Sequence, residues 1–195
     1  MTTRGEQYEQ QRNQILTVAL NHFTRDGFAG TSLRGVGREL GVSSGLLFHY
    51  FATKEALYTE LLRIAASRMA MDLDTATGDP VAFLRGQAEG VLTLLAEQPV
   101  AARFFLLVDY AQRHPGIDPE ADRLLADHQI VEQSIPVLAA GQRMGVVRDG
   151  DPHALALAFW ASLQGIAQEV AGRDDVPLPQ TEWILDLVLT PGGPR

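Results

Sequence analysis

The sequence contains no cysteine, which excludes disulfide bridges, zinc sites with thiolate ligands, cysteine nucleophiles and redox dithiols. It also lacks the run of about 20 apolar residues that a transmembrane helix needs, since the best candidate, residues 154–163, is far too short. The first residues, MTTRGEQYEQQRNQ, hold no apolar segment of the kind found in a secretory signal. Together with a hydrophobic content of 46%, these absences predict a soluble, cytoplasmic, globular protein.

Basic residues are scarce as well: 16 Lys and Arg face 24 Asp and Glu, for a net charge of −8. Taken alone, this balance argues against nucleic-acid binding. The charge is uneven, however, because residues 1–60 hold six basic and six acidic side chains and residues 61–195 carry the whole excess. A neutral first third and an acidic remainder suggest two functional regions.

Apolar residues recur with helical periodicity, and no stretch shows the sustained alternation of a half-buried strand. We therefore expect an all-α fold of about nine helices. Pro136 should kink or break the seventh of them by freeing the carbonyl of Glu132. The helices are predicted at about residues 6–25, 33–40, 43–50, 54–75, 81–97, 100–113, 120–143, 152–171 and 180–189.

The second and third predicted helices form a helix-turn-helix. Thr31 or Ser32 caps the second helix, and Gly41 ends it. Only Val42 then separates that end from Ser43, which is suited to cap the third helix. Two short helices joined by a glycine-containing turn of a few residues are typical of this motif.

The third helix has the composition of a helix that reads DNA. Leu47 and Phe51 lie four residues apart and can face inward, which leaves the other side chains toward solvent or DNA. Gly45 would allow a close approach to a base edge or sugar. His49, Tyr50, Lys54 and a hydroxyl at a helix N-terminus would contact phosphates. The same pattern also fits a helical hairpin with solvated polar residues. The candidate DNA-binding residues are Thr31, Ser32, Arg34, Ser43, Ser44, Gly45, Leu46, Phe48, His49, Tyr50 and Lys54.

A longer pattern makes the comparison specific. It reads Ile15-Leu16-x-x-Ala19-x-x-x-Phe23-x-x-x-Gly27-Phe28, then Thr31-Ser32-Leu33, then Gly41-Val42-Ser43-x-Gly45-x-Leu47-Phe48-His49-Tyr50-Phe51-x-x-Lys54-Glu55-x-Leu57. Over about residues 12–58 the sequence resembles the DNA-binding domain of the TetR family of bacterial repressors. Three features depart from the family pattern: Phe48 stands where Tyr is usual, Ser44 stands where Lys or Arg is frequent, and Gly35 and Gly37 lower the helix propensity of the second helix.

The resemblance implies a helix-turn-helix DNA-binding domain at residues 1–53 and a helical ligand-binding and dimerisation domain at residues 54–195. It also implies a transcriptional regulator, most simply a repressor, that binds a palindromic operator as a homodimer and is released by a small molecule. The family does not share the sequence of its second domain. The identity of the ligand therefore stays open.

The predicted helix at residues 100–113 is apolar on every side, which indicates burial among several helices. Aromatic and aliphatic side chains around it would line a ligand cavity, with an amide or imidazole as a polar contact. Each of them fits a plain hydrophobic core equally well. The candidate ligand-binding residues are Met69, Phe83, Gln87, Phe104, Phe105, Val108, His128, Trp160 and Gln164.

A dimer interface is predicted near the C-terminus. Ala154, Ala158, Ala161 and Gly165 repeat at spacings of four, three and four, and large apolar residues fill the other faces of the same helix. Such a helix needs cover on two sides, and a two-fold partner is the economical cover for the side that the core does not reach. The last helix would complete a four-helix interface with Trp183, Ile184 and Leu187.

We expect neither an enzyme nor a metal or cofactor site. The five histidines show no spacing of three or four residues from one another, and no catalytic triad or glycine-rich elbow is present. The glycines at positions 35, 37 and 41 follow a helix and turn rather than a strand, which argues against dinucleotide binding. The alternative functions are a ligand-binding or carrier protein with a degenerate helix-turn-helix and, third, a helical enzyme.

Overall fold

A computed structural model of the chain describes residues 3–69, 73–127, 129–173 and 175–191. Within these residues the chain forms eleven α-helices, one short 3₁₀-helix and a single isolated antiparallel bridge between Val147 and Leu189, with no strand. The predicted all-α fold class is confirmed. No single helix of the described chain has both the length and the apolar character to cross a membrane. One sharply bent pair, Pro80–Glu97 with Pro99–Arg113, passes that test only when its two helices are taken together.

The chain divides into two compact units. Unit 1 comprises Met1–Arg68 and Leu106–Asp127, and unit 2 comprises Met69–Phe105 and His128–Arg195. The predicted boundary at residue 53 falls inside unit 1, and the functional division that it stands for stays a prediction.

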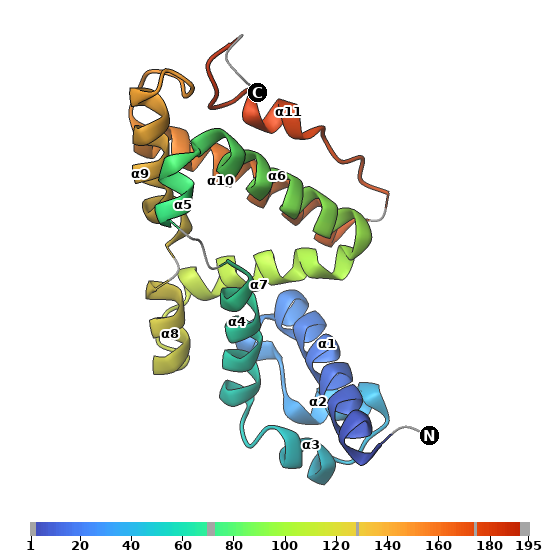
Figure 1. Cartoon of the computed structure of the whole chain (residues 1–195). Helices are drawn as coiled ribbons and strands as arrows, with labels where there is room; N and C mark the ends of the chain where they lie inside the picture. Colours follow the sequence, from blue (N-terminus) through green and yellow to red (C-terminus); the bar gives the residue numbers. More distant parts are fainter. Residues whose placement is uncertain (1–2, 70–72, 128, 174, 192–195) are drawn as a thin grey trace. The chain divides into compact units, whose positions relative to one another are not determined.

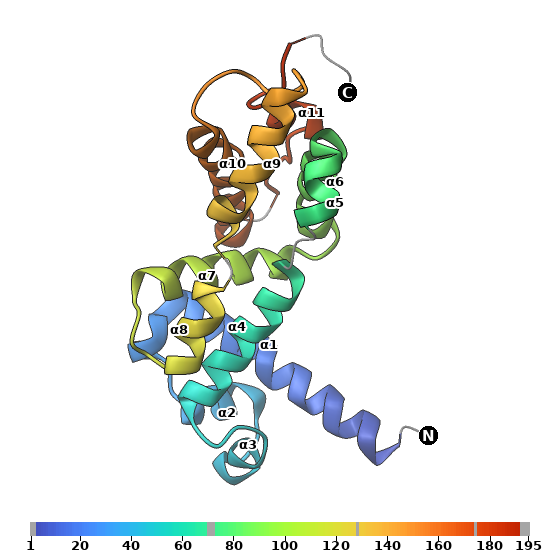
Figure 2. The ribbon, with the colours of Figure 1, turned by 60° about the vertical axis from the view of Figure 1, so that its left-hand side comes forward.

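Unit 1 contains the predicted helix-turn-helix (Figure 1). Figures 1 and 2 both show α3 at one end of this unit. Its helices are α1 (Arg4–Gly30), α2 (Leu33–Leu40), α3 (Ser44–Tyr50), α4 (Lys54–Met69), the larger part of α7 (Ala102–Arg113) and α8 (Pro119–Ala126).

The core of unit 1 forms on one stripe of α1 and an aromatic cluster. Five residues of α1 at helical spacing are buried: Ile15, Leu16, Ala19, Leu20 and Phe23. The ring of Tyr58 from α4 meets Phe23 and Phe28 edge-on, with both centroid distances at 5.1 Å. Burial raises the pKa of the Tyr58 phenol, because the apolar surroundings disfavour the phenolate. The packing of α4 on α1 thus rests on neutral aromatic surfaces.

Gly27 breaks α1 where the sequence predicts its end. Its φ of 69° and ψ of 178° are non-helical, and the backbone resumes a last turn as far as Gly30. A Cβ at this position would lie 3.2 Å from the hydroxyl oxygen of Tyr110 in α7. Glycine therefore satisfies both the left-handed φ and the close approach of a ring.

Unit 2 is a bundle in which α9 packs against α10 and α5, and α6 packs against α11 (Figure 2). Its buried core includes Leu84, Leu138, Phe159, Trp160 and Ile184. Its elements are α5 (Leu73–Gly78), α6 (Pro80–Glu97), the 3₁₀-helix η1 (Pro99–Ala101), the first residues of α7, α9 (Ile130–Arg143), α10 (Pro152–Gly172) and α11 (Thr181–Leu185).

Two of the predicted helices each correspond to parts of two helices in the structure. Residues 120–143 form two helices, α8 and α9, because the first packs in unit 1 and the second in unit 2. Pro136 is accommodated inside α9, where it is exposed to solvent. Residues 54–75 contain α4 and the start of α5, on either side of residues 70–72, which lie outside the described residues.

The last predicted helix is shorter than expected because its end joins other backbone. The amide of Arg148 donates to the carbonyl of Val188 (2.9 Å), and the amide of Thr190 donates to the carbonyl of Val146 (3.0 Å). Residues 188–190 therefore pair with the turn after α9 instead of extending α11.

Gly141 is the place where this turn meets α9. An ideal Cβ on Gly141 would overlap Cγ2 of Val147 and lie 3.3 Å from Cβ of Pro80. We expect Gly141→Ala to lower the free energy of unfolding of unit 2 by about 1–3 kcal/mol through overpacking. Urea unfolding followed by tryptophan fluorescence measures this, since both tryptophans, Trp160 and Trp183, lie in unit 2.

Gly86→Ala is the matched control. Gly86 also lies in a helix, but a Cβ there would meet nothing within 4 Å. Alanine at this position should raise stability by about 0.5–1 kcal/mol through helix propensity and lower chain entropy in the unfolded state. Equal effects of the two substitutions would contradict the close packing at Gly141.

Candidate nucleic-acid interface

The helix-turn-helix is delimited by two serine N-caps and one left-handed glycine. The hydroxyl of Ser32 accepts from the amide of Gly35 (3.1 Å), so Ser32 is the N-cap of α2. Gly41 has a φ of 68°, and the amide of Val42 donates to the carbonyl of Gly37 (2.9 Å). The hydroxyl of Ser43 accepts from the amide of Leu46 (3.2 Å) and caps α3. These are the local signals that the sequence carries for a helix-turn-helix.

Gly37 allows α2 and α3 to pack closely. A Cβ at this buried position would lie 3.3 Å from both Cδ1 of Leu47 and the carbonyl oxygen of Val42. A larger residue would push α3 outward. The low helix propensity of this glycine in α2 is therefore matched by a packing role.

One side of α3 packs inward and the other is exposed. Leu47 and Phe51 are buried, as their spacing predicts. Tyr50 and Lys54 are partly buried, whereas Arg34 and Ser43 are exposed. The exposed surface of the helix, called the α3 face below, consists of Ser44, Gly45, Leu46, Phe48 and His49.

The first turns of α1 contact the end of α3, which sequence reasoning did not foresee. The ring of Tyr8 stacks on Tyr50, with a centroid distance of 4.6 Å and an interplanar angle of 28°. His49 meets Tyr8 edge-on at 6.4 Å. Arg12 lies over the ring of Phe51 and forms an ion pair with Glu60 of α4. The N-terminal half of α1 is thus attached to α3 and α4 by contacts outside the buried stripe of α1.

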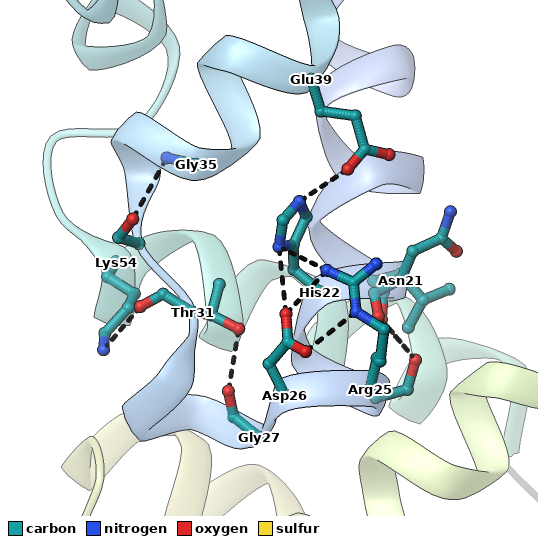
Figure 3. Close-up of polar contacts among 12 residues, drawn as sticks. Asn21, His22, Arg25, Asp26, Gly27, Thr31, Gly35, Glu39 and Lys54 are labelled. Atoms are coloured by element: carbon teal, nitrogen blue, oxygen red, sulfur yellow. Dashed lines mark hydrogen bonds and ion pairs between the residues drawn. The ribbon is translucent and has the colours of Figure 1, made fainter.

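A polar cluster connects α1 to α2 (Figure 3). Nε2 of His22 lies 2.9 Å from a carboxylate oxygen of Glu39 in α2, and Nδ1 lies 3.4 Å from Asp26. Arg25 donates two hydrogen bonds of 2.8 Å to Asp26, and these lower the pKa of that carboxyl. The cluster fixes α2 on α1 at the side chain of His22.

Lys54 is engaged inside unit 1. Its ammonium donates to the carbonyls of Phe28 (2.8 Å) and Thr31 (3.1 Å; Figure 3) and lies 4.1 Å from the centroid of the Phe28 ring. Thr31 is only 3% exposed, and its hydroxyl donates to the carbonyl of Gly27 (2.8 Å). Both side chains were expected at the DNA surface. In this structure they hold the end of α1, so Ser32 is the hydroxyl that remains outside.

The predicted ligand-binding residues are divided between the two units. Val108 belongs to unit 1, whereas Phe83, Gln87, Phe104 and Phe105 are partly buried in unit 2. His128 and the side chain of Met69 lie outside the described residues.

The polar atoms of two candidates already have partners in unit 2. Nε1 of the buried Trp160 donates to the hydroxyl of Ser134 (3.0 Å), and Nε2 of Gln164 donates to the carbonyl of Phe105 (3.2 Å). These contacts favour a core role for Trp160. The set as a whole stays a prediction.

Most of the predicted dimer residues are exposed, and those on α10 lie on one face of that helix. Ala154, Ala158 and Ala161 of α10 are exposed, and Gly165 is partly buried. Trp183 of α11 is 60% exposed and Leu187 is also exposed. Leu157, which was not predicted, is 53% exposed at the position that completes this surface.

Ile184 is the exception. It is buried in the core of unit 2, so its side chain packs within its own chain rather than facing a second copy. The sequence predicts a helix that contains both Ile184 and Trp183, but it does not show which side of the short α11 the core covers.

Among the side chains that the structure describes, no group of three or more His, Asp or Glu residues is arranged to hold a metal ion. A shallow surface depression lies beside the Arg85–Glu182 ion pair, between α6 and α11. None of the predicted ligand-binding residues lines it.

Comparison with known proteins gives consistent matches. The sequence pattern of the family described as "Bacterial regulatory proteins, tetR family" matches residues 15–61. The transcriptional regulator RutR of Escherichia coli strain K12 is 29% identical over 190 residues, which cover 91% of this chain and 88% of RutR.

Solved structures share the fold along most of the chain. The ketosteroid transcriptional regulator KstR2 of Mycobacterium tuberculosis has a TM-score of 0.76 at 19% identity, covering 92% of this chain and 95% of KstR2. AibR, solved in complex with isovaleryl coenzyme A and operator DNA, has a TM-score of 0.68 at 18% identity, covering 90% of this chain and 94% of AibR.

The contacts of Lys54 predict a structural effect of its removal. Lys54→Met keeps the aliphatic stem but leaves two carbonyls without a charged donor, so we expect unfolding stability to fall by about 1–3 kcal/mol. Far-UV circular dichroism in urea measures the loss. Arg34→Met, at an exposed position of the same unit, should change stability by less than about 0.5 kcal/mol. Unchanged stability in Lys54→Met would show that the ammonium serves mainly another partner, such as phosphate.

Proposed function

The chain belongs to the TetR family of bacterial regulatory proteins, and on this basis we propose that it represses transcription as a ligand-released homodimer on a palindromic operator. Unit 1 supplies the DNA-binding surface and unit 2 supplies the ligand-binding and dimerisation surfaces.

The observation that carries the proposal is the geometry of α2, its turn and α3. Two capped helices joined at Gly41 present the α3 face outward while Leu47 and Phe51 anchor the helix from behind. An α-helix fits the major groove, which is about 12 Å wide. Gly45, at the centre of this face, has only Ser43 Oγ at 4.0 Å from an ideal Cβ. The backbone of α3 is therefore open to close approach.

Flanking groups would hold the phosphates. Ser32, Arg34 and Ser43 are exposed around the first turns of α2 and α3. His49 and Tyr50 lie at the end of α3, where the stack on Tyr8 fixes the orientation of Tyr50. Contacts to phosphate set the register of a protein on DNA but carry no sequence information.

A second copy of the chain is the proposed cover for the exposed surface of α10 and α11. Small side chains let two helices approach closely, and the exposed Leu157, Trp183 and Leu187 supply apolar area around them. A C₂ dimer buries the same patch on both copies. It also pairs the single helix-turn-helix of each chain, as a palindromic site requires.

Release by a small molecule is proposed from the family and from AibR, which was solved with isovaleryl coenzyme A and operator DNA. In this chain the candidate contacts are the partly buried aromatic residues of α6 and α7 in unit 2. A ligand that releases DNA must bind the free protein more tightly than it binds the protein on DNA. Operator DNA then weakens ligand binding by the same factor, typically 5- to 150-fold.

The second candidate is a ligand-binding or carrier protein whose helix-turn-helix no longer binds DNA. It is favoured by the few basic residues near α3 and by the engagement of Lys54 inside unit 1. A gel shift against the DNA that flanks the gene separates the two functions. Retardation that a shuffled sequence does not compete away supports the repressor, and its absence supports the carrier.

The small number of exposed cations predicts a shallow salt dependence. We expect about 4–8 phosphate contacts per dimer, so log K should fall with log[salt] with a slope of about −4 to −7. Fluorescence anisotropy of a labelled operator between 50 and 200 mM salt measures this slope. Over that range the affinity falls by about one decade for every few phosphate contacts. A slope that is equally steep for operator and shuffled DNA, with equal affinity, would contradict specific binding.

The dimer surface predicts a selective effect of added charge. Leu157→Glu places a carboxylate in the proposed interface and should shift the protein toward monomer in sedimentation equilibrium, with a weaker affinity for the operator. Met144→Glu is the control, because Met144 is 54% exposed, against 53% for Leu157, and lies at the end of α9 outside this surface. A dimer that tolerates Leu157→Glu as well as Met144→Glu would place the interface elsewhere.

A further inference from the structure

The α3 face lacks the side chains that most often read base edges. α3 has the sequence SGLLFHY, which contains no Arg, Lys, Asn, Gln, Asp or Glu. The common hydrogen-bonding pairs, Arg or Lys with guanine and Asn or Gln with adenine, are therefore not available from this helix. Ser44 and His49 are the hydrogen-bonding side chains on the α3 face, and apolar contact is the other means of discrimination that this face offers.

Large apolar side chains occupy the face instead. Phe48 is 50% exposed and Leu46 is 39% exposed. The inner side of the helix is already filled by Leu47, which is fully buried, and by Phe51 directly after the helix. Exposed apolar area in water is unfavourable by about 25 cal/mol per Å². Two such residues on a seven-residue helix indicate a surface that becomes covered in a complex.

The position of Phe48 on the helix suits a contact in the groove. At 100° per residue, Gly45 and His49 lie roughly opposite the buried Leu47, and Phe48 lies beside them. Gly45, one turn before Phe48, leaves open space next to the ring. The phenyl group has no hydroxyl to donate to a phosphate, so an apolar partner is the one that it fits.

We propose that Phe48 is a specificity-determining residue that contacts the 5-methyl group of a thymine in each operator half-site. Among the four base pairs, only A·T and T·A present this methyl in the major groove, and it is the apolar group that a side chain can contact there. Each half-site then carries a thymine where Phe48 contacts it, and cytosine, which lacks the methyl, is disfavoured there. The inference rests on the proposed DNA-binding function and names the base that this function reads.

The test begins with the full-length protein and a library of random duplexes. Bound duplexes are selected over several rounds, and the enriched palindrome is resynthesised with deoxyuridine in place of thymine, one symmetric pair at a time. Deoxyuridine pairs as thymine does and lacks only the methyl. We expect one symmetric pair whose replacement weakens binding about tenfold, from the loss of one buried methyl in each half-site. 5-Methylcytosine at the same position, paired with guanine, should bind more tightly than cytosine.

Variants of Phe48 assign the effect to its ring. Phe48→Ala should bind the thymine and deoxyuridine duplexes with equal affinity, with an unchanged salt slope on shuffled DNA. Phe48→Tyr keeps the ring and should keep the preference for thymine. Because Phe48 is exposed, both variants should unfold at the temperature of the parent protein, which circular dichroism checks.

Each other outcome has a definite meaning. A protein that enriches no duplex overturns the proposed function together with this inference. An enriched palindrome that tolerates deoxyuridine at every position leaves DNA binding standing and overturns the thymine contact. A sensitive thymine pair that stays sensitive in Phe48→Ala assigns the methyl to another side chain, such as Leu46, and also overturns it.

Discussion

The helix-turn-helix depends on the ammonium of one residue, Lys54. It donates to the carbonyls of Phe28 and Thr31 and lies over the ring of Phe28. These carbonyls stand at the end of α1, where the amide of Thr31 also donates to the Phe28 carbonyl (3.3 Å). Lys54 is also the first residue of α4, so the cation joins the end of α1 to the start of α4. The chain between them, which holds α2, the turn and α3, is thereby closed at its base. The orientation of α3 in unit 1 follows from this closure and from the aromatic packing of Tyr58 on Phe23 and Phe28.

The parts of the fold that were predictable are those with local signals. The hydroxyl of Ser43 marks the beginning of α3, and the left-handed φ of Gly41 marks the end of α2. Such signals act within a few residues. The extents of later helices depended on packing partners far along the chain. The helix predicted at residues 120–143 is divided because its two parts pack in different units. The end of α11 is set by hydrogen bonds to residues 146–148. Periodicity shows that a segment is helical, but not where tertiary contacts end it.

The same distinction applies to the candidate site. The inward side chains of α3, Leu47 and Phe51, follow from helical spacing, and the α3 face is what remains. Lys54 and Thr31 were assigned to phosphate from their residue types, which describe what a side chain is able to donate. Their partners are fixed by contacts across more than 20 residues for Lys54 and by burial for Thr31. The stack of Tyr8 on Tyr50 joins residues that no periodicity relates. The sequence signal that could have indicated it is Tyr8 itself, an aromatic residue in the otherwise polar start of α1.

The exposed apolar residues of the two units differ in a way that fits different partners. On α10, small side chains recur on the exposed face over several turns, with Leu157 among them. This pattern lets the backbone of another helix come close along its length. On α3, the apolar side chains flank Gly45 on a single short helix and stand among serines and His49. A helix cannot bury so small and interrupted a patch, whereas a groove with isolated methyl groups between polar edges matches it. The shape and spacing of the apolar residues, more than their number, are why we propose a protein partner for unit 2 and a nucleic-acid partner for unit 1.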